Sequence, residues 1–136
     1  MSILGVLIRF FLAYIVLMIV AVVALRALGI ASNSGVNVGI LIGAVLWPSM
    51  AFGTKNGRYF NRAEKIKVVW GMIGINLALQ LLVGGGALAA EGRLSSGALV
   101  VALAFVGVIH SVAIYYFVGL AGKLLEKQAK KVAAGG

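Results

Sequence analysis

Long stretches without a charged side chain constrain this sequence more than any other feature. Residues 35–53, 68–90 and 94–122 form uncharged runs of 19, 23 and 29 residues, and residues 3–27 are apolar apart from Arg9 and Arg26. About 20 apolar residues suffice for a helix to cross a hydrocarbon core of about 30 Å. The mean hydropathy of +1.12 also exceeds what a water-soluble domain of this size could bury.

We therefore predict an all-α polytopic membrane protein, folded as one bundle of four transmembrane helices. The spans are expected at about 3–27, 35–53, 68–90 and 96–122, with a basic loop at 54–67 and a basic tail at 123–136. The first run could be mistaken for a secretory signal, but Arg26 interrupts the region where cleavage would occur. The fourth run is longer than a span requires, so we expect that helix to tilt or to begin along the interface.

The loop 54–67 carries five cations and one carboxylate. Within it, Asn61 and Glu64 have the spacing of a helix N-cap and its N3 carboxylate, which predicts that the third helix starts there. Pro48 lies near the end of the second span, where a kink would redirect the last turn into the loop. Glu91 and Arg93 form a short turn of balanced charge between the last two spans.

Topology follows from the distribution of lysine and arginine. If both termini share a side with the central loop, that side holds ten cations and the other holds Arg26 and Arg93. The positive-inside rule then predicts cytoplasmic termini in a bacterial inner membrane, with attraction to anionic lipids and no role in binding nucleic acid. The ten cations are Arg9, Lys55, Arg58, Arg62, Lys65, Lys67, Lys123, Lys127, Lys130 and Lys131.

Glycines at helical spacing predict close helix packing. Gly35, Gly39 and Gly43 form a tandem GxxxG series on the second span, which could face another span of this chain or a second protomer. On the third span, Gly71 and Gly74 lie on the side opposite Asn76, which predicts a central helix packed on both faces. Gly107 continues this small-residue pattern on the fourth span.

Four polar residues lie in the middle of the last two spans: Asn76, Gln80, His110 and Ser111. Asn76 and Gln80 are one helical turn apart, and His110 could match their depth and bond to them. They could line a path for a substrate or ion, or they could fix helix packing through interhelical hydrogen bonds, which we favour. A lone histidine and the absence of cysteine lead us to expect no metal site and no cofactor.

Charged residues are also informative where they are missing. Glu64, Glu91 and Glu126 all lie at or beyond the span ends, so no span carries a carboxylate. The small multidrug exporters share this size and four spans but need a glutamate in the first span. The dual-topology fluoride channels are also small four-span proteins, but their Thr/Ser-Phe segment is missing from the third span, and the charge bias here is too one-sided for dual insertion.

The loop and its flanks carry the short motifs Ala51-Phe52-Gly53, Asn56-Gly57-Arg58 and Arg62-Ala63-Glu64-Lys65, followed by Trp70-Gly71. In these the chain resembles a family of small four-helix proteobacterial inner-membrane proteins of unknown function. The resemblance implies an architecture and no activity.

Two functions are compatible with these patterns. The first is a non-enzymatic protein that acts through protein–protein interaction, either as an accessory subunit of a membrane complex or as an immunity-type protein. The second is a small homo-oligomeric channel or transporter that uses the polar residues as its lining. Short loops leave no room for a soluble catalytic module, and no charged pathway crosses the membrane, so we favour the first.

Overall fold

The computed structural model describes residues 1–30, 34–90 and 96–134, and in this part of the chain it contains four α-helices and no strand. The helices are α1 (Ile3–Ala27), α2 (Ser34–Asn56), α3 (Arg62–Ala90) and α4 (Ser96–Ala134). Each contains a stretch that is long and apolar enough to cross a membrane. The predicted all-α, four-helix fold is confirmed. The predicted turn at Glu91 and Arg93 lies outside the described residues.

Local signals set the ends of α1. The Ser2 side chain caps its first turn by accepting a hydrogen bond from the Gly5 backbone N–H at 3.1 Å. At the other end Gly29 adopts a φ of +65°, and its N–H donates to the Arg26 carbonyl at 3.2 Å. A residue without Cβ adopts this left-handed conformation at little cost, so Gly29 ends the helix.

A short link joins α2 and α3. α2 continues through Pro48 to Asn56, three residues past the expected end at 53, and Thr54 Oγ1 donates to the Met50 carbonyl at 3.1 Å. The non-helical link is therefore only 57–61, where Gly57 has a φ of +64°. The basic segment predicted at 54–67 is therefore helical at both ends, with residues 54–56 in α2 and residues 62–67 in α3.

The predicted start of α3 is confirmed. The Asn61 side-chain oxygen accepts from the Glu64 N–H, and the Glu64 carboxylate accepts from the Asn61 N–H, each at 2.9 Å. This is a capping box, which satisfies two backbone donors that the helix itself leaves free. The Lys65 N–H then donates to the Asn61 carbonyl at 2.9 Å, so the first helical turn follows directly.

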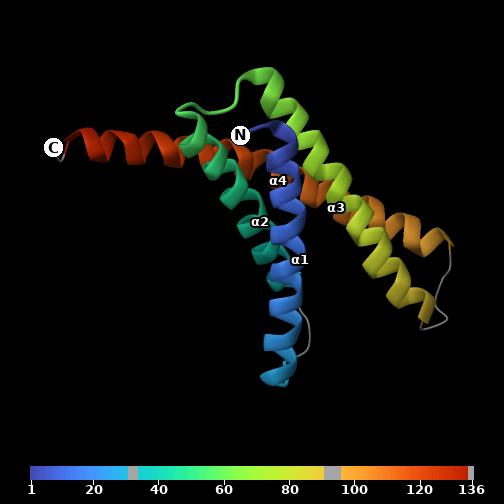
Figure 1. Cartoon of the computed structure of the whole chain (residues 1–136). Coiled ribbons are helices and arrows are strands. Elements are labelled where there is room, and N and C mark those ends of the chain that lie inside the picture. The colour runs from blue at the N-terminus through green and yellow to red at the C-terminus, as the bar shows by residue number, and fades with distance from the viewer. Residues whose placement is uncertain (31–33, 91–95, 135–136) are drawn as a thin grey trace.

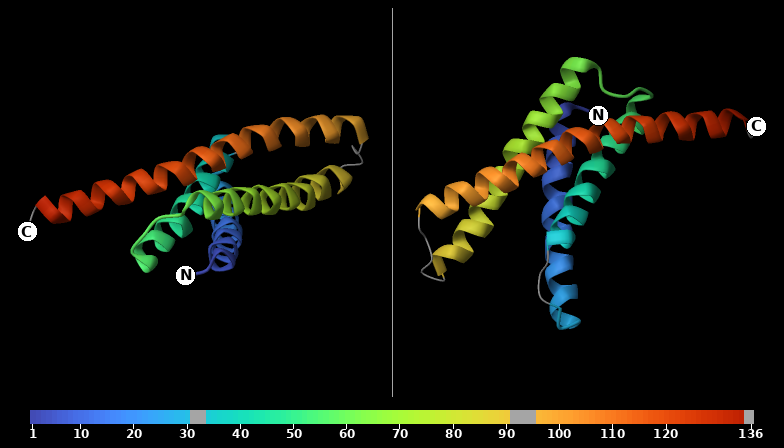
Figure 2. Two further views of the ribbon diagram at one scale, coloured as in Figure 1. Left: turned by 90° about the horizontal axis from the view of Figure 1, so that it is seen from above. Right: turned by 180° about the vertical axis from the view of Figure 1, so that it is seen from behind.

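The helices form two hairpins that cross and then diverge, as Figure 1 shows. α1 packs on α2 and α3, and α4 packs on the other faces of α2 and α3, so each helix has two main neighbours. Figure 2 shows α4 running across α1 and α2 rather than beside them. The small-residue face of α3 is packed only in part, because Gly71 lies against Leu7 of α1 whereas Gly74 and Ala78 are exposed.

The buried side chains gather where the hairpins cross. The largest of them include Phe10 of α1, Leu41 and Phe52 of α2, Met72 of α3 and Ile114 of α4. Among the described residues, α1 has no buried side chain after Tyr14, and α3 has none after Leu79. The described residues beyond these points in α1 and α3 therefore leave much apolar surface uncovered, as lipid-facing helices do.

The N-terminus, the central loop and the start of the tail meet at one end of the molecule. The Met1 ammonium donates to Asn56 Oδ1, and Asn56 Nδ2 donates back to the Met1 carbonyl at 3.0 Å. The Tyr59 hydroxyl donates to the Val118 carbonyl of α4. At 39 residues α4 is about 58 Å long, so its tail from Lys123 onward extends beyond a hydrocarbon core of about 30 Å.

Candidate functional site

A cluster of three polar side chains lies between α3 and α4. Asn76 and Gln80 come from successive turns of α3, and His110 faces them from α4. Gln80 Nε2 donates to Asn76 Oδ1 at 2.5 Å, and it lies 2.5 Å from His110 Nδ1. His110 Nδ1 is also 3.0 Å from Asn76 Oδ1. The structure thus brings together the three residues that the sequence placed at similar depth.

Two of the three side chains in the cluster are buried. Asn76 is 1% exposed and His110 is 7% exposed, while Gln80 is half-buried. The side chains lie near the point where the hairpins separate. Among the described residues, Tyr14 is the last buried residue of α1 and Leu79 is the last of α3. Buried amides and imidazoles in hydrocarbon need hydrogen-bond partners, which here come from the neighbouring helix.

The hydrogen bonds of this cluster cannot all be satisfied at once. Each of the three contacting atoms acts as a donor or as an acceptor, whichever tautomer His110 takes and whichever way the amides face. Among three atoms that are each either a donor or an acceptor, at least two are of the same kind. The contact between those two atoms is not a hydrogen bond. With the Gln80 amide donating to Asn76, as here, one of the two contacts with His110 is therefore not a hydrogen bond.

One further donor lacks a partner. Asn76 Nδ2 is buried and makes no hydrogen bond of ordinary geometry. The Tyr14 side chain of α1 lies close enough to interact with Asn76, which brings a third helix to the cluster. Tyr14 was not predicted from the sequence, although a hydroxyl in the middle of an apolar span is the signal that could have identified it. Ser111 turns away, because its Oγ donates to the Gly107 carbonyl of its own helix at 2.7 Å.

The predicted packing glycines divide into two groups. A Cβ added at Gly43 would lie 3.2 Å from Leu17 of α1; one at Gly71 would lie 2.7 Å from Leu7 of α1. A Cβ at Gly107 would lie 2.9 Å from Leu77 of α3.

Gly39 and Gly74 have no neighbouring atom within 4 Å of an added Cβ, and Gly35 is exposed. Gly39 and Gly74 therefore make no close helix contact with the part of the chain that the structure describes. Two further glycines lie at close contacts: a Cβ at Gly53, which the sequence did not single out, would collide with Leu125, and one at Gly122 would lie 2.8 Å from the Tyr59 ring.

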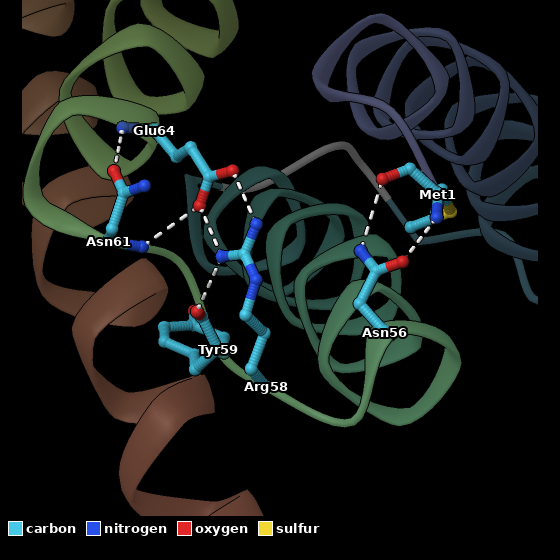
Figure 3. Close-up of polar contacts among 6 residues, drawn as sticks. All are labelled: Met1, Asn56, Arg58, Tyr59, Asn61 and Glu64. Atoms are coloured by element: carbon cyan, nitrogen blue, oxygen red, sulfur yellow. Dashed lines mark hydrogen bonds and ion pairs between the residues drawn. The ribbon is translucent and has the colours of Figure 1, made fainter.

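The basic residues surround the end where the termini and the loop meet. Arg58 forms a two-pronged ion pair with Glu64, with nitrogen–oxygen distances of 2.7 and 2.8 Å (Figure 3). The Lys65 ammonium lies 4.9 Å from the centroid of the Tyr115 ring. Most of the other predicted anchors are exposed: Lys55, Arg62, Lys67, Lys123, Lys127, Lys130 and Lys131.

The ion pair shifts the pKa values of both of its members, which lie before the uncharged run that begins at Val68. The hydrogen bond from Arg58 and the Asn61 N–H hold the pKa of Glu64 down at about 2, and Glu64 in turn raises the pKa of Arg58. Burial raises the pKa of Tyr59 to about 12. Its hydroxyl therefore stays protonated at physiological pH and keeps donating to the Val118 carbonyl.

No group of three or more histidine, cysteine, aspartate or glutamate side chains able to hold a metal ion occurs within 1–30, 34–90 and 96–134. Comparison with known proteins finds no matching family model, no matching curated protein and no matching solved structure. The site must therefore be interpreted from its own geometry. That geometry offers a buried polar cluster, a basic end, and helix surfaces that none of the described residues covers.

Proposed function

We propose that this chain is a non-enzymatic, multi-pass protein of the bacterial inner membrane that acts through protein–protein interaction. It would serve as an accessory subunit of a membrane complex or as an immunity-type protein. Both termini and the basic loop would face the cytoplasm, in keeping with the ten cations on that side.

The observation that carries this proposal is the uncovered half of the α2 glycine face. Gly43 is close to Leu17 of α1, but one turn further along the helix Gly39 has open space at its Cβ position, and Gly35 is exposed. Small residues at four-residue spacing let two helix backbones approach closely in a membrane. The outer half of α2 therefore fits a helix from a partner or from a second copy of this chain.

The polar cluster supports the same proposal by what it contacts. Asn76 and His110 are enclosed between α3 and α4, and their contacts cross from one helix to the other. This is the arrangement expected of residues that fix helix packing rather than residues that line an aqueous path.

Filling the glycine face tests the proposal. Purification in mild detergent from native membranes should return a complex larger than one chain, measured by native mass spectrometry. Gly39→Leu should dissociate it without unfolding the protein, because nothing lies within 4 Å of the added Cβ. Val38→Leu, which enlarges the exposed neighbouring side chain, is the matched control and should retain the complex. A wild-type chain that runs alone, or a complex indifferent to Gly39→Leu, would refute the proposal.

A channel or transporter is the second candidate, and one observation favours it. Asn76 Nδ2 is buried without a partner, and the cluster contains one contact that cannot be a hydrogen bond. Water or a small polar solute entering between α3 and α4 would relieve both. In that case the uncovered face of α2 would join protomers around the path.

A further inference from the structure

An open apolar groove runs along the joint between α1 and α2. It has a volume of about 450 Å³ and is lined by Leu12, Ala13, Val16 and Leu17 of α1 and by Gly43 and Trp47 of α2. Leu12 and Val16 are 54% and 57% exposed, so their side chains form an open wall. The groove exists because Gly43 contributes no side chain to it, while Trp47 one turn away forms a tall rim.

A cation stands at one end of this groove. Arg9 precedes Leu12 and Ala13 by one turn of α1, so the three share a helix face. The Arg9 guanidinium lies 5.9 Å from the centroid of the Trp47 ring. Within the described ranges the one ion pair joins Arg58 and Glu64, so none of the carboxylates in those ranges pairs with Arg9.

The position of Arg9 along the helix is that of a lipid headgroup. It lies two turns from the start of α1, at the end of the molecule where Met1 meets Asn56 and where the basic residues gather. Tryptophan rings such as that of Trp47 concentrate at the same interfacial level. From there residues 9–17 rise about 12 Å toward the membrane centre, and the groove follows them.

We propose that this groove binds an anionic glycerophospholipid, with the lipid phosphate paired to Arg9 and one acyl chain lying along Leu12, Val16 and Gly43. The guanidinium at the end of the groove complements a phosphate at headgroup depth, and the apolar walls complement the acyl chain attached to it. The bound lipid lies on the inner half of α2. The partner face proposed above, at Gly35 and Gly39, lies on the outer half.

Tryptophan quenching by brominated lipid tests this site directly. A Trp70→Phe chain leaves Trp47 as the sole tryptophan, and bromine on an acyl chain quenches a tryptophan that it touches. The chain would be reconstituted in phosphatidylcholine vesicles containing either brominated phosphatidylglycerol or brominated phosphatidylcholine at equal mole fraction. We expect about a fivefold preference of the Trp47 site for the anionic lipid, the ratio that corresponds to about 1 kcal/mol for one cation near a lipid surface.

Three variants of that chain separate the possible results. Arg9→Gln should abolish the preference, whereas Arg26→Gln, at the other end of α1, should retain it. Val16→Phe should weaken quenching because the larger ring fills the groove. The Val16 side chain is already exposed, so this substitution does not disturb the buried core.

Equal quenching by both brominated lipids, or a preference that survives Arg9→Gln, would overturn the proposal. Quenching by both lipids well below that of free tryptophan in the same membrane would also overturn it, by showing that protein covers the groove.

Discussion

Replacing His110 tests whether the polar cluster holds α3 and α4 together. Each interhelical hydrogen bond in a membrane is worth about 0.6 kcal/mol on average and at most about 1.7 kcal/mol. The Gln80 amide already donates to Asn76, so only one of the two contacts of His110 can be a hydrogen bond. Double-mutant cycles should therefore give unequal couplings: about 0.6–1.7 kcal/mol between His110 and one of the two amide residues, and none or an unfavourable value with the other.

The measurement is reversible unfolding in mixed micelles for His110→Leu, Asn76→Leu, Gln80→Met and the two double variants. Ser111→Ala is the matched control, because the Ser111 hydroxyl bonds only within its own helix. It should change the free energy of unfolding by less than about 0.5 kcal/mol. Couplings near zero for both pairs would refute the idea that the cluster fixes helix packing. Two strong favourable couplings would refute the claim that only one of the two contacts of His110 is a hydrogen bond.

Three further results are expected. Gly122→Ala should lower the free energy of unfolding by about 1–3 kcal/mol, because its Cβ would lie 2.8 Å from a Tyr59 ring held in place by Val118. Gly119→Ala, 3.4 Å from the flexible Lys65 ammonium, should not lower it, and equal losses in both would contradict the packing argument. Arg58→Gln should raise the pKa of Glu64 from about 2 toward its ordinary 4.5, as measured by NMR titration. Since the pKa is lowered in the folded state, the stabilisation from the Glu64 carboxylate is complete above pH 4.5 and is lost as the pH falls toward 2. A pKa that stays near 2 in the variant would exclude the ion pair as the main cause of the shift. Neutralising Lys55, Arg58, Arg62, Lys65 and Lys67 together with the tail residues Lys123, Lys127, Lys130 and Lys131 leaves Arg9 against Arg26 and Arg93. This should invert the topology, measured by the accessibility of a terminal cysteine tag to a membrane-impermeant thiol reagent, and an unchanged orientation would contradict the charge argument.

The features that sequence predicted are those decided by local chemistry. Asn61 and Glu64 are three residues apart, and their reciprocal bonds to each other's backbone need nothing from the rest of the chain. The four helices follow from runs whose length matches a membrane. Asn76, Gln80 and His110 could be paired in advance because their depth in the spans follows from counting residues.

The features that sequence did not predict depend on how the hairpins cross. Which glycines lie at helix contacts depends on the crossing point, so Gly53 is tightly packed while Gly39 and Gly74 are open. The hydrogen bond between Met1 and Asn56 joins residues 55 positions apart, so no local sequence pattern predicts it. The groove between α1 and α2 likewise arises from the meeting of Arg9 with Trp47, whose spacing in sequence carries no signal.

Solute flux measures the central claim most directly, because a packing cluster and a conducting lining differ in that property alone. Liposomes containing only this chain would be loaded with a pH-sensitive dye and with a radioactive cation in parallel samples. We predict leakage equal to that of protein-free liposomes for the wild type, Asn76→Leu and His110→Ala alike. Flux through the wild-type chain that either substitution abolishes would contradict the interaction proposal and establish the polar cluster as a path across the membrane.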